Sequence, residues 1–306
     1  MKKNVLIIGY GSIGKRHAKI LKKFKDVAKI YIFTKQKCKS FNKISNINEI
    51  KKISPDYIII SSRTSEHFMH LSFIEKNFKN RLILVEKPLF DTSKNLKIKN
   101  NKVFVGYNLR YHPIINFIKN FIKNKKIFSI NINCQSYLPN WRKNINYTKS
   151  NSARKTYGGG VLLELSHEID YLQLIFKRVT KLHNSLVKKI SDLKIDTEDY
   201  VLIAGKTAMA NFYMSLNFFS LQSQRRIMVS GNMFNLEADL LKNTVKIFEK
   251  GKIKNKKFKV DKNYTYMKQH RCLLDGNLTQ ACKYNEGVKL MSLINKIKNF
   301  KLNAKK

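Results

Sequence analysis

A short apolar strand that runs directly into a glycine-rich turn constrains the fold of this chain more than any other feature. Val5–Ile8 leads into Gly9-Tyr10-Gly11-Ser12-Ile13-Gly14, a run with the spacing G-x-G-x-x-G. Apolar residues then recur at helical spacing, at Ile13, Ala18, Ile20, Leu21 and Phe24. A strand, this turn and a helix in succession are typical of the unit that binds a dinucleotide pyrophosphate at a helix N-terminus. The alternative is a glycine-rich turn that binds nothing.

Each glycine of this turn has its own predicted role. Gly9 makes the tight turn, Gly11 lets the pyrophosphate approach the backbone, and Gly14 lets the helix pack against the strand. Ser12 and Ile13 begin the helix, where backbone N–H groups face the negative charge, so they complete the predicted pyrophosphate contacts.

The first hundred residues alternate apolar strands with helical segments. The predicted strands are Val5–Ile8, Ile30–Phe33, Tyr57–Ile60, Leu82–Val85 and Val103–Val105, and His67–Lys76 is a predicted helix. Such alternation predicts parallel strands joined by crossover helices, which is the α/β class with a doubly wound Rossmann sheet. We expect residues 1–112 to form this NAD(P)-binding domain.

The pattern changes after this point and predicts a second domain over residues 113–306. Here we expect an α+β domain with an open-faced, mostly antiparallel sheet and helices on one face. The predicted elements are strands at Ile127–Cys134, Ala208–Phe218, Arg226–Ser230, Phe234–Asp239 and Thr244–Phe248, and helices at Val161–Phe176 and Gly287–Ile297.

The formal net charge of +41 raises the possibility of a nucleic-acid or acidic-membrane partner. Only ten of the 61 basic residues are arginine, and the lysines are scattered along the whole chain rather than gathered in one stripe with interleaved aromatics. We therefore expect no specific nucleic-acid partner. The charge favours anionic substrates by electrostatic steering.

The cysteines and the apolar runs indicate a reducing cytoplasm and no membrane span. Cys38, Cys134, Cys272 and Cys282 are far apart and form no C-x-x-C pair, so neither a metal cage nor a disulfide framework is expected. No apolar run approaches the length of a membrane helix.

The end of the second predicted strand bears on the form of the cofactor. A carboxylate about 20 residues beyond the glycines usually binds the ribose 2′-hydroxyl of NAD. Here Phe33 is followed by Thr34-Lys35-Gln36-Lys37, without a carboxylate. Thr34 and Lys35 suit a 2′-phosphate, which favours NADP over NAD, unless these lysines only reflect the general excess of lysine.

A charged pair follows the fourth predicted strand. Glu86-Lys87-Pro88 stands at the carboxyl end of Leu82–Val85, where ligands bind in parallel sheets. A lysine beside a cofactor can exchange a proton with a substrate hydroxyl, and Glu86 can orient it. The alternative is an ordinary surface lysine.

A second candidate lies in Gly158–Asp170, where three glycines precede a predicted helix. Glu164, His167 and Asp170 are spaced by three residues and would share one helix face. A histidine between two carboxylates is suited to acid–base chemistry or to binding a substrate hydroxyl. The alternative is a helix packed by its leucines around one hydrogen-bonded histidine, and no further ligand cluster supports a metal.

Together these motifs resemble the glucose–fructose oxidoreductase, inositol dehydrogenase and MocA (Gfo/Idh/MocA) family over nearly the whole chain. Their order and spacing are more specific than any one of them. The matching segments are Gly9–His17, Asp56–Ile60, Thr64–His67, Glu86–Pro88, Val105–Tyr111, Pro139–Arg142 and Gly158–Asp170.

The resemblance implies roles for individual residues. Lys87 would be the catalytic lysine and His167 the second catalytic or hydroxyl-binding residue. Glu164, three residues before His167, would be a third catalytic residue, where many members have an aspartate four residues before the histidine. The residues implied in contacts with the cofactor are Ser61, Thr64, His67, Glu86 and Lys87. The residues implied in substrate binding are Lys87, Tyr107, Asn108, Arg110, Trp141, Arg142, Arg154, His167 and Asp170.

The sequence therefore predicts a cytoplasmic NAD(P)-dependent oxidoreductase that transfers hydride between nicotinamide and a carbon of a sugar, nucleotide sugar or polyol, with a role in surface-glycan biosynthesis as one option. A non-catalytic dinucleotide or sugar sensor with the same fold is the alternative. The resemblance also implies a homo-oligomer, a dimer or a tetramer, with Phe212, Phe218 and Phe219 as candidates for its surface.

Overall fold

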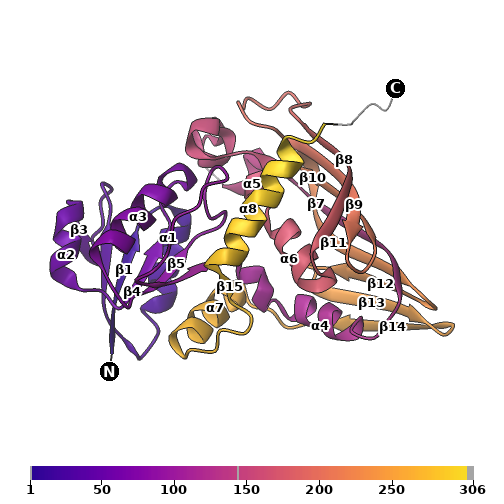
Figure 1. The fold of residues 1–306 in the computed structure, drawn as a ribbon, viewed down its shortest axis with the longest axis horizontal. Coiled ribbons are helices and arrows are strands. Elements are labelled where there is room, and N and C mark those ends of the chain that lie inside the picture. Colours follow the sequence, from indigo (N-terminus) through magenta and orange to yellow (C-terminus); the bar gives the residue numbers. More distant parts are fainter. Residues whose placement is uncertain (1, 143–144, 302–306) are drawn as a thin grey trace. The chain divides into compact units, whose positions relative to one another are not determined.

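A computed structural model describes residues 2–142 and 145–301 and divides the chain into two compact units. The first unit comprises the residues up to Asn108 together with Asn263–Met291. The second comprises Leu109–Lys262 and the residues from Ser292 onward. Figure 1 shows the elements of both units in the colours of the sequence.

The first unit is built on a seven-stranded sheet with the order β15-β6-β5-β4-β1-β2-β3. Strands β1 to β6 are parallel, and β15 pairs antiparallel with β6. The predicted doubly wound sheet is thus confirmed, with its five predicted strands in place. The strands are β1 (Lys3–Ile8), β2 (Val27–Phe33), β3 (Asn42–Ile44), β4 (Tyr57–Ile60), β5 (Leu82–Val85), β6 (Lys102–Val105) and β15 (Cys282–Lys283).

The helices of this unit are α1 (Ser12–Leu21), α2 (Ile50–Ile53), α3 (His67–Asn77) and α7 (Tyr264–Leu274). A further helix, α8 (Tyr284–Lys298), begins in the first unit and ends in the second. One buried cluster joins Val5 and Ile7 of β1 to Leu21 of α1 and Leu273 of α7, so α1 and α7 cover the same face of the sheet. Alternate residues of β1 point to the other face, where α3 packs against β4.

Residues 263–291 differ from the expected division at residue 112. The prediction from the sequence assigns these residues to the second domain, whereas the structure groups them with the Rossmann sheet. The physical reason is that α7 contributes Leu273 to the core beside α1, and that Cys282 pairs with Val105 at the sheet edge. Two strand residues are too few for a periodicity signal in the sequence.

The second unit contains an eight-stranded sheet with the order β14-β13-β12-β11-β7-β10-β9-β8. All neighbours are antiparallel except β7 and β10, which confirms the mostly antiparallel prediction. The strands are β7 (Ile127–Tyr137), β8 (Val179–Lys188), β9 (Tyr200–Thr207), β10 (Asn211–Asn217), β11 (Phe219–Gly231), β12 (Phe234–Asp239), β13 (Thr244–Glu249) and β14 (Lys252–Lys257).

Three helices lie on one face of this sheet: α4 (Pro113–Phe121), α5 (Val161–Glu164) and α6 (His167–Phe176). Figure 1 shows them on the same side of the strands. The prediction of one continuous helix over 161–176 was wrong. The Ser166 N–H bonds to Leu163 and the Glu168 N–H to Leu165, so three-residue spacing replaces the helical four at this point. Glu164 and His167 therefore lie on separate helices.

Two of the three residues expected at an oligomer surface are instead core residues. Phe212 is 5% exposed and Phe218 is fully buried, because their side chains point to the inner face of the sheet. Only Phe219 is half-buried, and its ring lies 5.9 Å from that of Tyr200. Within the described ranges, no helix combines the length and the apolarity that crossing a bilayer requires.

Candidate cofactor and active site

The glycine-rich turn of the first unit has the geometry that a dinucleotide needs. Gly9 has a φ of +96°, a conformation that L side chains rarely adopt, and its N–H donates to the carbonyl of Phe33 at 3.0 Å. A Cβ on Gly14 would collide with the carbonyl oxygen of Gly9 and lie 2.9 Å from Oγ of Ser61. Both positions therefore require glycine for reasons of the fold itself.

Gly11 differs from the other two glycines of the turn. Its backbone is extended, at φ −72° and ψ −166°, and a Cβ there would meet no atom within 4 Å. The α1 helix begins directly after it without a side-chain cap. Gly11 and Ser12 are exposed and Ile13 is half-buried. Open space over a helix N-terminus is a site for an anion, so the turn fits a dinucleotide pyrophosphate.

The end of β2 presents basic rather than acidic groups. Thr34 is buried, and its Oγ1 accepts a hydrogen bond from the Gln36 N–H at 3.1 Å, which fixes the turn. Lys35 is exposed beside it. The Lys35 ammonium is therefore the group of this pair that is able to reach a ligand.

Ser61 and His67 brace the loops at the carboxyl ends of the strands. Oγ of Ser61 donates to the carbonyls of Ile8 and Gly9 at 3.3 and 3.1 Å. The buried His67 ring, at the start of α3, lies within 3.3 Å of the carbonyls of Pro88, Leu89 and Ser62.

Burial lowers the pKa of His67 against the raising effect of these carbonyls, so the ring is a neutral brace rather than a charge. Thr64, half-buried, opens the 3₁₀ turn Thr64–Glu66 before α3.

The Glu86-Lys87-Pro88 segment follows β5, and the Lys87–Pro88 bond is cis. Lys87 is half-buried. The Glu86 carboxylate is 6% exposed, and its Oε1 lies 3.0 Å from Nε2 of His17 on α1. Glu86 is thus directed into the core of the unit rather than toward the open side of the glycine turn.

Tyr107 and Asn108 follow β6, and both are buried. Nδ2 of Asn108 donates to Oγ1 of Thr265 at 2.8 Å, which joins the end of the parallel sheet to α7. This contact gives Asn108 a structural role.

In the second unit, two predicted substrate-binding residues pair with each other. Nε of Arg110 lies 3.0 Å from both carboxylate oxygens of Asp170, and Nη2 lies 2.7 Å from Oδ1. Arg110 is 6% and Asp170 3% exposed. This buried two-pronged ion pair clamps the 3₁₀ turn Asn108–Tyr111 to α6, so Asp170 has a structural role.

The glycine triplet and the starts of α5 and α6 are held by a second set of contacts in this unit. Gly160 has a φ of +112°, and a Cβ there would collide with the Glu198 carboxylate. Oε1 of Glu164 accepts a hydrogen bond from Oγ of Ser152 at 2.7 Å, which holds the preceding loop to α5. His167, the first residue of α6, is 9% exposed.

The polar segment before the glycine triplet contains the remaining predicted substrate residues. Nε1 of Trp141 donates to Oγ of Ser136 at 2.8 Å, and Arg142 is exposed. Nε of Arg154 donates to the carbonyl of Thr148 at 2.9 Å, and its guanidinium lies 3.7 Å from Asp196. Residues 143 and 144 of this segment lie outside the described residues.

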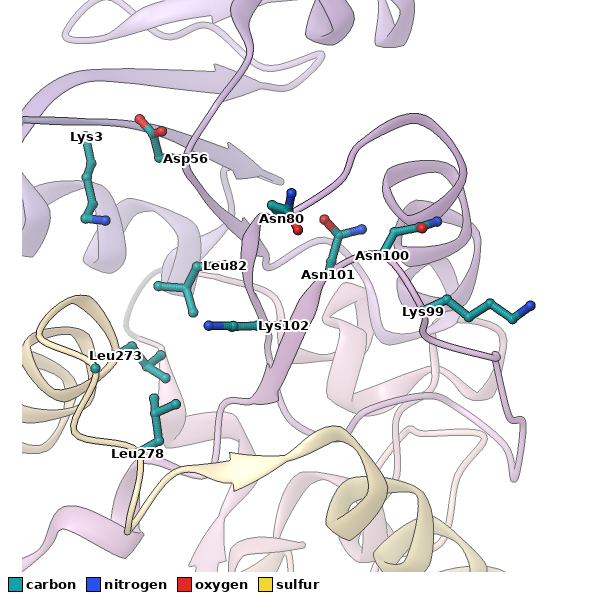
Figure 2. Close-up of a pocket in the computed structure, with 11 residues that line it drawn as sticks. Lys3, Asp56, Asn80, Leu82, Lys99, Asn100, Asn101, Lys102, Leu273 and Leu278 are labelled. Atoms are coloured by element: carbon teal, nitrogen blue, oxygen red, sulfur yellow. The ribbon is translucent and has the colours of Figure 1, made fainter.

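The first unit contains a cavity of about 640 Å³, whose lining residues are drawn in Figure 2. Lys3, Leu82 and Lys102 stand at the amino ends of β1, β5 and β6 and line it. Ligands of doubly wound sheets bind at the carboxyl ends of the strands, so this cavity is not the cofactor site. Among the described residues no cluster of side chains is suited to a metal ion.

Sequence reasoning missed three residues that the structure brings together with Glu86. They are His17 on α1, Tyr57 on β4 and His270 on α7, all fully buried. The available signal was the position of His17 three residues after Gly14, on the face of α1 that packs against the sheet.

Comparison with known proteins agrees with this geometry. Residues 3–100 match the protein family GFO_IDH_MocA, which is described as "Oxidoreductase family, NAD-binding Rossmann fold". The similarity to that oxidoreductase family therefore covers about the first third of the chain. No curated protein sequence matches the chain significantly.

Solved oxidoreductases share the fold along nearly the whole chain. Levoglucosan dehydrogenase in complex with NADH is 16% identical, with a TM-score of 0.81 over 97% of this chain and 96% of its own. The WlbA dehydrogenase from Bordetella pertussis, in complex with NADH and UDP-GlcNAcA, is 15% identical, with a TM-score of 0.77 over 97% and 96%. The MviM dehydrogenase from Clostridium difficile is 20% identical, with a TM-score of 0.76 over 98% and 99%.

Proposed function

We propose that this chain is an NAD(P)-dependent dehydrogenase acting on a CH–OH group of a sugar, a nucleotide sugar or a related polyol. The observation that carries the proposal is the open space over Gly11 at the N-terminus of α1, inside a segment that is similar to the oxidoreductase family. The similar folds of a sugar dehydrogenase and of a dehydrogenase bound to UDP-GlcNAcA support the substrate class. Synthesis of surface glycans is one role that such a substrate allows.

The proposed mechanism assigns the proton to Lys87. When bound, the nicotinamide accepts or gives the hydride at the hydroxyl-bearing carbon. The Lys87 amine takes the proton of that hydroxyl during oxidation and returns it during reduction. His167 binds the neighbouring hydroxyl. Gly11, Ser12 and Ile13 hold the pyrophosphate through backbone N–H groups.

NADP is the cofactor that we favour over NAD. Lys35 is exposed at the end of β2, and neither Thr34 nor its neighbours to Lys37 supply the carboxylate that usually binds the 2′-hydroxyl of NAD. We also propose a cytoplasmic homo-oligomer, a dimer or a tetramer. Light scattering on the purified protein tests the oligomer, and a monomer would exclude it.

The test of the mechanism compares Lys87→Met with Lys79→Met, a change of an exposed lysine in the same unit. Reduced nicotinamide is measured after mixing the protein and NADP or NAD with free sugars, sugar acids, inositols and UDP-sugars. We expect Lys87→Met to lower kcat by roughly 10²- to 10⁴-fold, as expected for loss of a general acid or base, and Lys79→Met to leave it unchanged. A Lys87→Met variant within a few-fold of the native rate would exclude the assigned role.

A dinucleotide-binding sensor of the same fold is the second candidate. The buried contacts of Arg110 with Asp170 and of Asn108 with Thr265 leave fewer groups for a substrate than the sequence suggested, which favours this candidate. Tight NAD(P) binding with no turnover on the whole substrate panel would select the sensor.

A further inference from the structure

A chain of buried polar side chains crosses the core of the first unit. Oε1 of Glu86 lies 3.0 Å from Nε2 of His17, and Nδ1 of His17 lies 2.8 Å from Nε2 of His270. Nδ1 of His270 lies 2.9 Å from the hydroxyl of Tyr57. The four residues come from the end of β5, from α1, from α7 and from β4. This hydrogen-bond chain therefore joins segments separated by up to 253 positions in the sequence.

The surroundings of this hydrogen-bond chain are apolar and aromatic. His17, His270 and Tyr57 are fully buried. The ring of Tyr266 stands edge-on to His17 at 5.5 Å, and that of Phe24 stands edge-on to His270 at 6.3 Å. A polar group buried in such a place without a partner is destabilising, so hydrogen bonds between these side chains stabilise their burial.

The hydrogen bonds of the chain have one direction. Burial, and then the neighbouring His17, lower the pKa of His270 well below its ordinary value, so this ring is neutral at pH 7 and has one N–H. A carboxylate only accepts, so His17 donates to Glu86 from Nε2. The contact distances accommodate His270 as the donor from Nε2 to Nδ1 of His17, and the Tyr57 hydroxyl as the donor to Nδ1 of His270.

The hydrogen-bond chain ends at Glu86, the residue before Lys87, and the Glu86 carboxylate has little free space around it. A Cβ on Gly106 would lie 2.6 Å from Oε1 of Glu86, so the backbone after β6 leaves the carboxylate little space on that side. On the other side, His17 belongs to the helix that begins at the glycine turn. The position of Glu86 is therefore set from α1, and Lys87 follows it directly in the sequence.

We propose that His17 and His270 are positioning residues that hold the Glu86 carboxylate through this directional chain, and with it the Glu86-Lys87-Pro88 turn relative to the helix at the cofactor turn. Neither histidine touches the substrate. The inference rests on the proposed function to the extent that Lys87 is the proton carrier.

Two variants of His270 separate hydrogen bonding from packing. His270→Gln keeps a side-chain N–H for His17 and an oxygen for Tyr57, whereas His270→Leu removes both. We expect His270→Leu to lower kcat at least tenfold while the Kd for NAD(P) changes less than threefold, and His270→Gln to retain kcat within threefold. Native kcat in His270→Leu, or equal losses in both variants, would overturn the proposal.

Nitrogen NMR of the native protein, labelled at histidine, tests the direction of the chain without any variant or substrate. His17→Gln and His270→Gln assign the two signals. We expect both rings to bear a proton on Nε2 and to accept a hydrogen bond at Nδ1. A proton on Nδ1 of either ring would overturn the directional chain. Absence of turnover in the native protein contradicts the proposed function alone, because the NMR result still decides the state of the chain.

Discussion

Breaking the ion pair between Arg110 and Asp170 should destabilise the second unit strongly. The pair has three nitrogen–oxygen contacts of 2.7 to 3.0 Å, and its side chains are 7% and 3% exposed. In Asp170→Leu the guanidinium stays buried without its counter-charge, which costs about 3–5 kcal/mol. In a unit of this size 1 kcal/mol shifts Tm by about 2–4 °C, so Tm should fall by roughly 6–20 °C.

The matched control is Asp196→Leu. Asp196 pairs with Arg154 at 3.7 Å, but both side chains are almost half exposed, and exposed pairs contribute about 0–1 kcal/mol. Urea and thermal unfolding, followed by circular dichroism, compare Asp170→Leu, Arg110→Met and Asp196→Leu with the native protein. The double variant Arg110→Met with Asp170→Leu should recover most of the loss, because it removes both buried charges.

Two results would refute this reasoning. One is an Asp170→Leu variant whose unfolding free energy lies within about 1 kcal/mol of native, as for an exposed pair. The other is a double variant whose loss equals the sum of the single losses, which would show that the two side chains stabilise the unit independently.

Three further predictions concern the cofactor turn, the cofactor form and the pH dependence of stability. Gly11→Ala should keep the native Tm but weaken NAD(P) binding at least about tenfold by calorimetry, whereas Gly14→Ala should lose about 1–3 kcal/mol of stability by overpacking. Lys35→Glu should shift the ratio of NADP to NAD affinity toward NAD; an unchanged ratio would exclude Lys35 as a phosphate ligand. Burial lowers the pKa of His112 to about 4, below the value in the unfolded protein. Its contribution to the free energy of unfolding is therefore complete above about pH 6.5 and falls by about 3 kcal/mol toward pH 4. His112→Asn, which keeps a helix cap, should lack this slope in urea unfolding; a parallel slope would contradict the assignment.

The sequence was sufficient for the Rossmann sheet because each of its main strands is apolar on both faces and ends at a turn or a charged motif. Tyr57–Ile60 and Leu82–Val85 appear with the predicted bounds. The short strand Cys282–Lys283 escaped prediction, since its place depends on pairing with residues almost 180 positions away. The break after Glu164 escaped because the leucines on both sides continue the helical spacing.

The candidate site was harder to predict than the fold. Residue type and spacing indicated Glu86, Arg110 and Asp170, but not which group each side chain would meet. Arg110 meets Asp170 60 positions away, and Glu86 meets His17 69 positions away. Such pairings depend on the tertiary structure and leave no local pattern in the sequence, so they cannot be predicted from a single sequence.

We infer that this chain binds a nicotinamide dinucleotide at the turn around Gly11 and uses it for hydride transfer beside Lys87. The most direct test of this inference is a single-turnover measurement of reduced nicotinamide on the sugar and UDP-sugar panel, with the native protein and Lys87→Met, after each has been saturated with NADP or NAD. We expect equal cofactor binding in both proteins, and turnover in the native protein that the variant loses by about 10²-fold or more. Equal turnover in both proteins, or no dinucleotide binding to the native protein, would contradict it.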